Sequence, residues 1–336
     1  MRRLALVTLL TLATSAGAYD AVQRPTTNRN GAAVVHAEGG TLVKDCSSIE
    51  YSWQFARWLV TDQDEFRFYD QSGGGATGTG AFFCGTSASD HEGITFVAKS
   101  GADASKVWVQ EEATGQICEY DGAQIFDGTP TTFNRLRTVT LPACGATSFA
   151  GSTEGLVFVP DPTCTTCGGS SCLYGGYFYV GKQTGGGPIG KFCVPASCPT
   201  QVAAASTSDA TAECSAVCVS LLTVPAGCAP WTESVALTYD WDTDLVYVLD
   251  DADTVADDVC VLDRTLGAVV QKYTLSEPRG TQYEGLAIGP GRIAFCEDHS
   301  GGATGGGSDC TLNAPAVNTG CGLWIYDTTR KLRGGE

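Results

Sequence analysis

The sequence predicts an all-β fold made of repeated units. Charged residues make up 17% of the 336 residues, glycine occurs 42 times, and helical periodicity is nearly absent. Short runs of β-branched and aromatic residues alternate with turn-forming residues, as expected for strands. One pattern recurs: a glutamate, a small residue, an apolar strand, a turn, and a second strand that ends in acids. A repeat near this length with several strands per unit is typical of a β-propeller, in which each unit forms one blade.

The clearest unit covers residues 90–121. Glu92 and a glycine open its first strand, Glu111 and Glu112 close its second, and a third strand is expected over residues 116–120. The interval of 79 residues between Glu154 and Glu233 has room for a further blade or for an insertion. We count five units and expect a single propeller of six blades. The glutamates that open the visible units are Glu50, Glu92, Glu154, Glu233 and Glu284.

These glutamates are expected at one rim of the ring. Consecutive strands of a blade are antiparallel, so the start of the first and the end of the second lie at the same end. Carboxylates that gather in this way repel one another unless a cation or protons intervene, and oxygen ligands suit calcium. We therefore predict that the five glutamates bind calcium, or another divalent cation, at the mouth of the channel. The acids expected beside them are Asp62, Glu111, Glu112, Asp250, Asp251, Glu297 and Asp298.

A second interpretation of the motif needs no metal. The Glu-Gly pair could simply mark the start of a strand and a tight turn, where glycine supplies backbone freedom.

The same rim supplies candidate catalytic groups. His91 precedes Glu92, and His299 follows Asp298. A calcium-bound water that is deprotonated by a histidine or a carboxylate such as Asp298 would attack a carbonyl or phosphoryl group. The alternative is that both histidines are solvated loop residues. Lys182 stands where other units have acids, so it could bind a substrate phosphate or carboxylate, or pair with a glutamate in a structural role.

The first 18 residues are expected to be a signal peptide. Arg2 and Arg3 precede an apolar run over residues 4–12, and Ala-Gly-Ala at 16–18 is a typical cleavage site. No other apolar stretch is long enough for a membrane helix. We expect a secreted, extracellular protein with an extended segment over residues 19–45, a propeller domain over 46–330 and a short tail over 331–336. The extended segment could supply an outer strand that closes the ring.

Cysteine usage agrees with an oxidising compartment. All 16 cysteines follow the expected cleavage site, and their even number indicates disulfides that staple long loop insertions. The spacing of Cys164 and Cys167 also allows a zinc ribbon, which we favour less in a secreted chain. The sequence does not predict how the cysteines pair.

The charge balance argues against nucleic acid as a partner. The chain has 37 acidic and 20 basic residues, and nucleic acid binding needs a basic surface.

Three stretches carry a family resemblance: DHEGI with VWVQEE after it, LPACGATSFAGSTEGLVF, and YEGLAI with IAFCEDHSGG. They resemble the phytase-like, esterase-like propeller family, and calcium-dependent lactonase and gluconolactonase propellers are related to it. The resemblance implies a six-bladed ring, a central divalent ion and hydrolysis of a small-molecule ester or phosphoester. The fourth unit departs from the pattern, with Ser234 where the motif has glycine.

Two functions are compatible with these features. The first is a secreted calcium-dependent hydrolase that acts at the channel mouth. The second is a non-catalytic extracellular propeller, with a structural ion, whose surface binds an extracellular partner. Propellers host both kinds of function, so the fold does not choose between them.

Overall fold

The computed structural model describes thirteen stretches of the chain: residues 31–34, 46–62, 65–71, 77–79, 82–84, 91–127, 133–183, 186–207, 211–229, 231–250, 258–274, 282–298 and 323–327. The predicted signal peptide, most of the segment over 19–45, His299 and the tail over 331–336 lie outside these stretches.

The described strands form five sheets of mainly antiparallel strands, which we call blades 1 to 5. Blade 1 contains β2 (Cys46–Ser52), β3 (Arg57–Asp62), β4 (Glu65–Tyr69) and β5 (Thr77–Gly78). Blade 2 contains β6 (His91–Phe96), β7 (Lys106–Glu111), β8 (Gln116–Asp121) and β9 (Asn134–Thr140). Blade 3 contains β10 (Thr153–Pro160), β11 (Gly176–Lys182), β12 (Ile189–Cys193) and β15 (Val217–Leu222). Blade 4 contains β16 (Ala236–Asp240), β17 (Leu245–Asp250), β18 (Asp258–Asp263) and β19 (Val269–Thr274). Blade 5 contains β20 (Gln282–Gly289), β21 (Arg292–Asp298), β22 (Leu323–Asp327) and β1 (Gly31–Val34).

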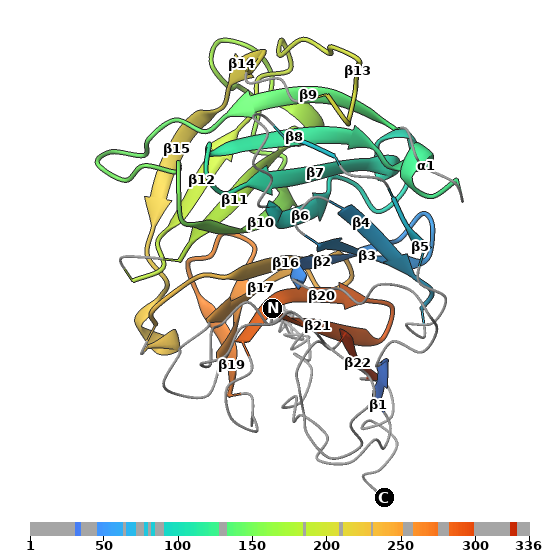
Figure 1. Ribbon diagram of the computed structural model, residues 1–336. Helices are drawn as coiled ribbons and strands as arrows, with labels where there is room; N and C mark the ends of the chain where they lie inside the picture. Colours follow the sequence, from blue (N-terminus) through green and yellow to red (C-terminus); the bar gives the residue numbers. More distant parts are fainter. Residues whose placement is uncertain are drawn as a thin grey trace, which may run out of the picture.

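The first strands of the blades form a closed ring (Figure 1). β2 packs against β6, β6 against β10, β10 against β16, β16 against β20, and β20 against β2. The fold is therefore an all-β propeller, as predicted. The described residues supply five sheets to this ring, and the expected count of six is not confirmed.

The interval of 79 residues explains the difference. Its residues extend existing blades instead of forming a new one: β13 (Ala203–Ala204) and β14 (Cys214–Ser215) both pair with β9 of blade 2. β15 then completes blade 3 by pairing with β12. The interval is an insertion, which was one of its two interpretations.

Blade 5 joins the two ends of the described chain. β1 pairs antiparallel with β22, so a strand from the predicted extended segment completes the last blade. The prediction that this segment supplies an outer strand is confirmed. A disulfide between Cys46 of β2 and Cys296 of β21 ties the first blade to the last.

The glycine of the repeated motif is required by contact between blades. A Cβ on Gly93 would lie 2.5 Å from the Cβ of Leu156 in blade 3, and one on Gly155 would lie 2.9 Å from the backbone nitrogen of Leu237 in blade 4. A Cβ on Gly285 would lie 3.0 Å from the nitrogen of Ile49. None of these glycines has a positive φ, so the interpretation of the motif as a tight turn that needs backbone freedom is wrong.

Seven disulfides connect the fourteen described cysteines, and none of these cysteines is unpaired. Cys164 bonds to Cys172 and Cys167 to Cys193, so the zinc-ribbon interpretation of this pair is wrong. The predicted stapling of insertions is confirmed. The remaining pairs, besides the one at the ring closure, are Cys84–Cys118, Cys144–Cys218, Cys198–Cys214 and Cys228–Cys260.

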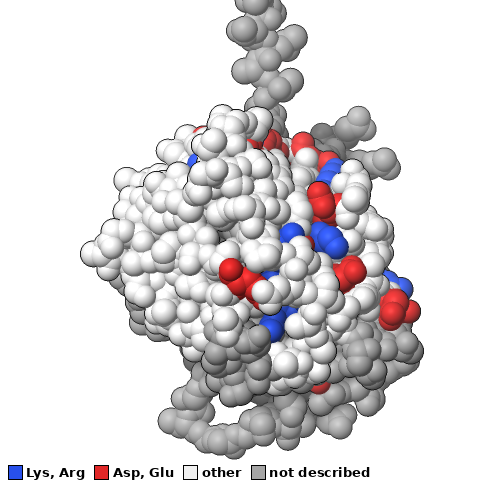
Figure 2. Space-filling view, turned by 90° about the horizontal axis from the view of Figure 1, so that it is seen from above, with Lys and Arg blue, Asp and Glu red and all other residues white. Residues whose placement is uncertain are grey.

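The core lies between the blades. Apolar side chains from facing sheets form clusters, for example Phe158 and Phe178 of blade 3 with Trp108 of blade 2. Seen from above (Figure 2), acidic and basic side chains gather on the right of the described surface, while the left shows few of them.

Candidate functional site

Three of the five motif glutamates occupy equivalent positions. In blades 2, 3 and 5 the pairing of the first and second strands shifts register at the glutamate, which therefore lies in a β-bulge. Glu92 and Glu154 are buried, with 8% and 4% exposure, and Glu284 is half-buried. The sequence repeat thus marks a real structural position, at the start of each of these first strands.

The other two glutamates are out of register. Ser48 in blade 1 and Ala236 in blade 4 occupy the position of the motif glycine, because they pair with the second strand at the equivalent point. Glu50 therefore lies two residues further along its strand than the motif glycine does. Glu233 lies before β16 begins. The prediction that all five glutamates share one level at the rim is wrong for these two.

Glu50 points into the ring and contacts the opposite side. Its Oε2 accepts a hydrogen bond from Thr238 Oγ1 of blade 4 at 3.2 Å, and its Oε1 accepts one from the Tyr51 backbone nitrogen at 2.8 Å. Burial raises the pKa of Glu50 to about 8, and the two hydrogen bonds act in the opposite direction. Burial in the ring therefore favours the protonated form of this carboxyl.

The acids that close second strands hold the backbone of nearby loops. Glu111 accepts hydrogen bonds from the backbone nitrogens of Ala113 and Thr114 at 3.2 and 2.7 Å. Glu112 accepts one from the backbone nitrogen of Ser152, at the start of blade 3, at 2.9 Å.

Asp250 does the same in blade 4. Its Oδ1 accepts hydrogen bonds from the backbone nitrogens of Thr232 and Glu233 at 2.9 and 2.8 Å. It accepts a third from the hydroxyl of Thr232 at 3.0 Å. The acid therefore fixes the segment that leads into β16.

Lys182 lies among acids, as the sequence predicted. Its Nζ donates to the backbone oxygen of Gly151 at 2.7 Å. Burial lowers the pKa of Lys182, while the carboxylates of Glu112 and Glu154 raise it. The cation thus balances two acids at the junction of blades 2 and 3, which fits the structural alternative. Its role in substrate binding stays a prediction.

His91 is fully buried. Its ring stacks on Phe82, with 4.3 Å between the ring centroids and 19° between the planes. This position favours packing and gives a substrate no access to the imidazole, so neither the catalytic nor the solvated-loop interpretation is supported. Asp298 ends β21, and His299 lies outside the described residues.

The geometry gives no support to the predicted calcium site. Within the described ranges, no three His, Cys, Asp or Glu side chains come together in a way that could hold a metal ion. Glu50 and Glu233 are out of register with the other three glutamates. The five predicted ligands therefore do not fit the ion as a set.

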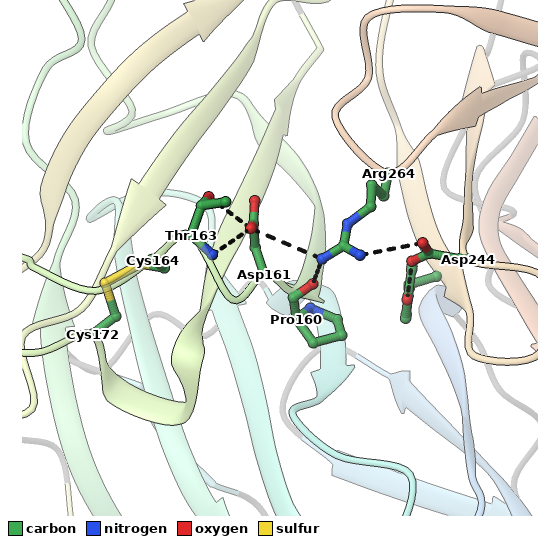
Figure 3. Close-up of polar contacts among 8 residues, drawn as sticks. Pro160, Asp161, Thr163, Cys164, Cys172, Asp244 and Arg264 are labelled. Atoms are coloured by element: carbon green, nitrogen blue, oxygen red, sulfur yellow. Dashed lines mark hydrogen bonds and ion pairs between the residues drawn. A yellow bond between two sulfur atoms is a disulfide. The ribbon is translucent and has the colours of Figure 1, made fainter.

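The opposite end of the ring is closed by contacts between blades (Figure 3). Arg264, in the turn after β18, donates to the backbone oxygen of Pro160 in blade 3 at 2.5 Å and lies 3.9 Å from Asp161. It also pairs with Asp244 at 3.2 Å. At the same end Lys99 of blade 2 pairs with Asp242 of blade 4.

Sequence reasoning missed Thr238 because it aligned the blades on their acids. Aligning them on the small residue that contacts the next blade would have placed Thr238 and Glu50 at equivalent positions, each two residues beyond it. The signal was present, but in the small residues Ser48 and Ala236.

Comparisons with known proteins show no family for this chain. No protein-family model and no curated protein matches the sequence. The structure is similar to glutaminyl cyclase of Myxococcus xanthus, with 13% identity over 79% of this chain and 91% of that chain and a TM-score of 0.45. It is also similar to the β-propeller domain of Cps50 (Swd1) of Myceliophteria thermophila, with 9% identity, 79% and 65% coverage and a TM-score of 0.38. The third similar structure is hydrazine synthase of Kuenenia stuttgartiensis, with 10% identity and a TM-score of 0.37. The match covers 79% of this chain and 58% of that chain.

Proposed function

We propose that this protein is an extracellular propeller that binds a partner, and that its buried acids serve the scaffold. The observation that carries the proposal is the use of the acids themselves. Glu111, Glu112 and Asp250 each accept hydrogen bonds from backbone nitrogens of loops or of the next blade. Acids that bind backbone groups in this way make the frame rigid. We infer that the protein recognises its partner through the surface of this frame.

The disulfides support an extracellular location. Seven of them in a chain of this size are stable only in an oxidising compartment. None of the helices in the described stretches is long and apolar enough to cross a membrane. Together with the predicted signal peptide, the disulfides support secretion.

The competing function is a calcium-dependent hydrolase of esters or phosphoesters. Lys182 is the feature that favours it, because a cation beside Glu112 and Glu154 could position a substrate phosphate or carboxylate. The resemblance to phytase-like propellers points the same way. Against it stand the buried His91 and the out-of-register Glu50 and Glu233.

A turnover screen separates the two functions. Purified protein is assayed with aryl esters, lactones and phosphomonoesters, with calcium and with a chelator. We expect no turnover above that of the heat-denatured protein. Calcium-dependent turnover that is lost in Lys182→Met and retained in a control, Lys272→Met in blade 4, would overturn the proposal.

Partner binding is measured directly. The folded protein and a reduced, alkylated control are immobilised and exposed to the extracellular fluid of the source. A partner that binds only the folded form and rebinds after purification would support the proposal. If purified components never rebind and the turnover screen is positive, the hydrolase is the correct assignment.

A further inference from the structure

The outer strands of blades 3 and 4 have the same construction. β15 pairs only with β12, and β19 only with β18, among the strands that the structure describes. Each contains one extra residue relative to its neighbour: Val219 in β15 and Val270 in β19. This shared bulge aligns the two strands, and it places Leu221 of β15 at the position of Lys272 in β19.

The two strands differ at that aligned position. Lys272 forms an ion pair with Asp258 at 2.7 Å and donates to the backbone oxygen of Cys228 at 3.0 Å. A lysine on an outer strand discourages pairing with another chain. Leu221 supplies no such charge, and 41% of it is exposed. Val219 is 48% exposed, and Ser220 between the two residues is half-buried, so Val219 and Leu221 face the same side of the strand.

The other outer strands with described side chains are protected in other ways. β5 is only two residues long. β9 is covered by β13 and β14. Within this set, β15 alone offers a full-length edge with two exposed apolar residues and no charge.

The distribution of charge indicates which kind of partner could pair with the free edge of β15. The chain has a net charge of −17, so two copies repel each other over most of their surfaces, and a cationic partner would be attracted to the acidic regions instead. Residues 214–229 contain no charged residue. An uncharged extended segment is the matching partner, and β15 is itself such a segment.

We propose that β15 pairs antiparallel with β15 of a second copy, with the two-fold axis at Ser220. In this register Ser220 lies opposite Ser220, and Val219 lies opposite Leu221 of the second copy. The four exposed apolar side chains then form cross-strand pairs on one face. A single pair of short strands makes a small interface, so the dimer is expected to be concentration-dependent. This association goes beyond the proposed function and does not depend on it.

Sedimentation velocity over a wide range of protein concentration tests the proposal. The wild type is expected to shift from monomer to dimer. Leu221→Lys places two like charges at the interface and should weaken dimerisation at least about tenfold. Val270→Lys is the matched control, because Val270 occupies the equivalent bulge in β19 with 46% exposure. It should leave dimerisation unchanged, and the melting temperature of both variants checks that they are folded.

A cross-link tests the register. Ser220→Cys should form an intermolecular disulfide with its own copy, because residues directly opposite in an antiparallel pair have the Cα spacing of a disulfide. Peptide mapping checks that the native disulfides are intact. A monomeric wild type at all concentrations would overturn the proposal. So would equal effects of Leu221→Lys and Val270→Lys, or a cross-link through Val270→Cys but not through Ser220→Cys.

Discussion

At the inner strands, a small residue occupies the same position in all five blades, whereas at the outer strands every blade ends differently. Ser48, Gly93, Gly155, Ala236 and Gly285 all lie at that inner position. Outside, the edge is a two-residue strand, a covered strand, an uncharged strand, a strand with a lysine, or a strand from the other end of the chain.

The difference shows which contacts impose a repeat. Each inner strand packs against two others of the same kind, so a change in one blade must fit two neighbours. An outer strand has a sheet on one side only, so its blade can end in any way that controls the edge. The repeat in the sequence therefore reflects the packing of the inner strands. The disulfides and insertions reflect the differences among the outer strands.

The largest expected effect comes from the disulfide at the ring closure. The Cys46→Ala, Cys296→Ala variant should lose more free energy of unfolding than the Cys164→Ala, Cys172→Ala variant. The second variant removes a bond inside the loop between β10 and β11. The reason is loop length: the first bond spans 250 residues of sequence and the second spans 8. Because the other disulfides shorten the unfolded chain, we expect a difference of about 2 kcal/mol.

Urea denaturation of the two double variants measures this difference. Equal losses would mean that the bond between blades 1 and 5 adds nothing to ring closure beyond a local staple.

An added methyl group should distinguish the inner strands from the outer ones. Gly93→Ala places a Cβ 2.5 Å from that of Leu156 and 2.7 Å from its nitrogen, so backbone must move. We expect a loss of about 1–3 kcal/mol. Gly78→Ala, on the outer strand β5, meets only ordinary contacts at 3.7 Å and should change stability by less than about 0.5 kcal/mol. Thermal unfolding compares the two, and similar shifts would contradict the assignment of the glycine to blade packing.

The smallest expected effect is a pH-dependent change in stability that is caused by Glu50. A carboxyl with a raised pKa binds its proton more tightly in the folded state. The stability that it adds is fully present below its ordinary pKa of 4.5 and is lost as the pH rises toward about 8. Glu50→Gln keeps an acceptor for Thr238 but cannot ionise. Its melting temperature relative to that of the wild type should therefore rise as the pH increases between these two pKa values.

Glu65→Gln is the control, because Glu65 lies on the outer strand β4 and pairs with Arg67. If the difference between Glu50→Gln and the wild type were constant over this pH range, Glu50 would not be protonated in the ring.

The sequence predicted the propeller because inner packing leaves a periodic trace. It also predicted the N-terminal strand and the disulfide character of the insertions. It did not predict the register of Glu50 and Glu233, because an acid near a strand start resembles the motif whether or not a small residue follows at the right place. Nor did it predict the burial of His91, which depends on Phe82 from a loop that carries no repeat.

The meeting of β1 and β22 in blade 5 has a consequence for biosynthesis. Blade 5 lacks two of its strands until residues 323–327 have left the ribosome, although β1 was made first. Until β20 is made, the inner faces of β2 and β16 remain uncovered, because both strands pack against β20. The nascent chain therefore needs protection from aggregation until β20 has been made, and a chain that stops before Gln282 would leave an open ring with these faces exposed.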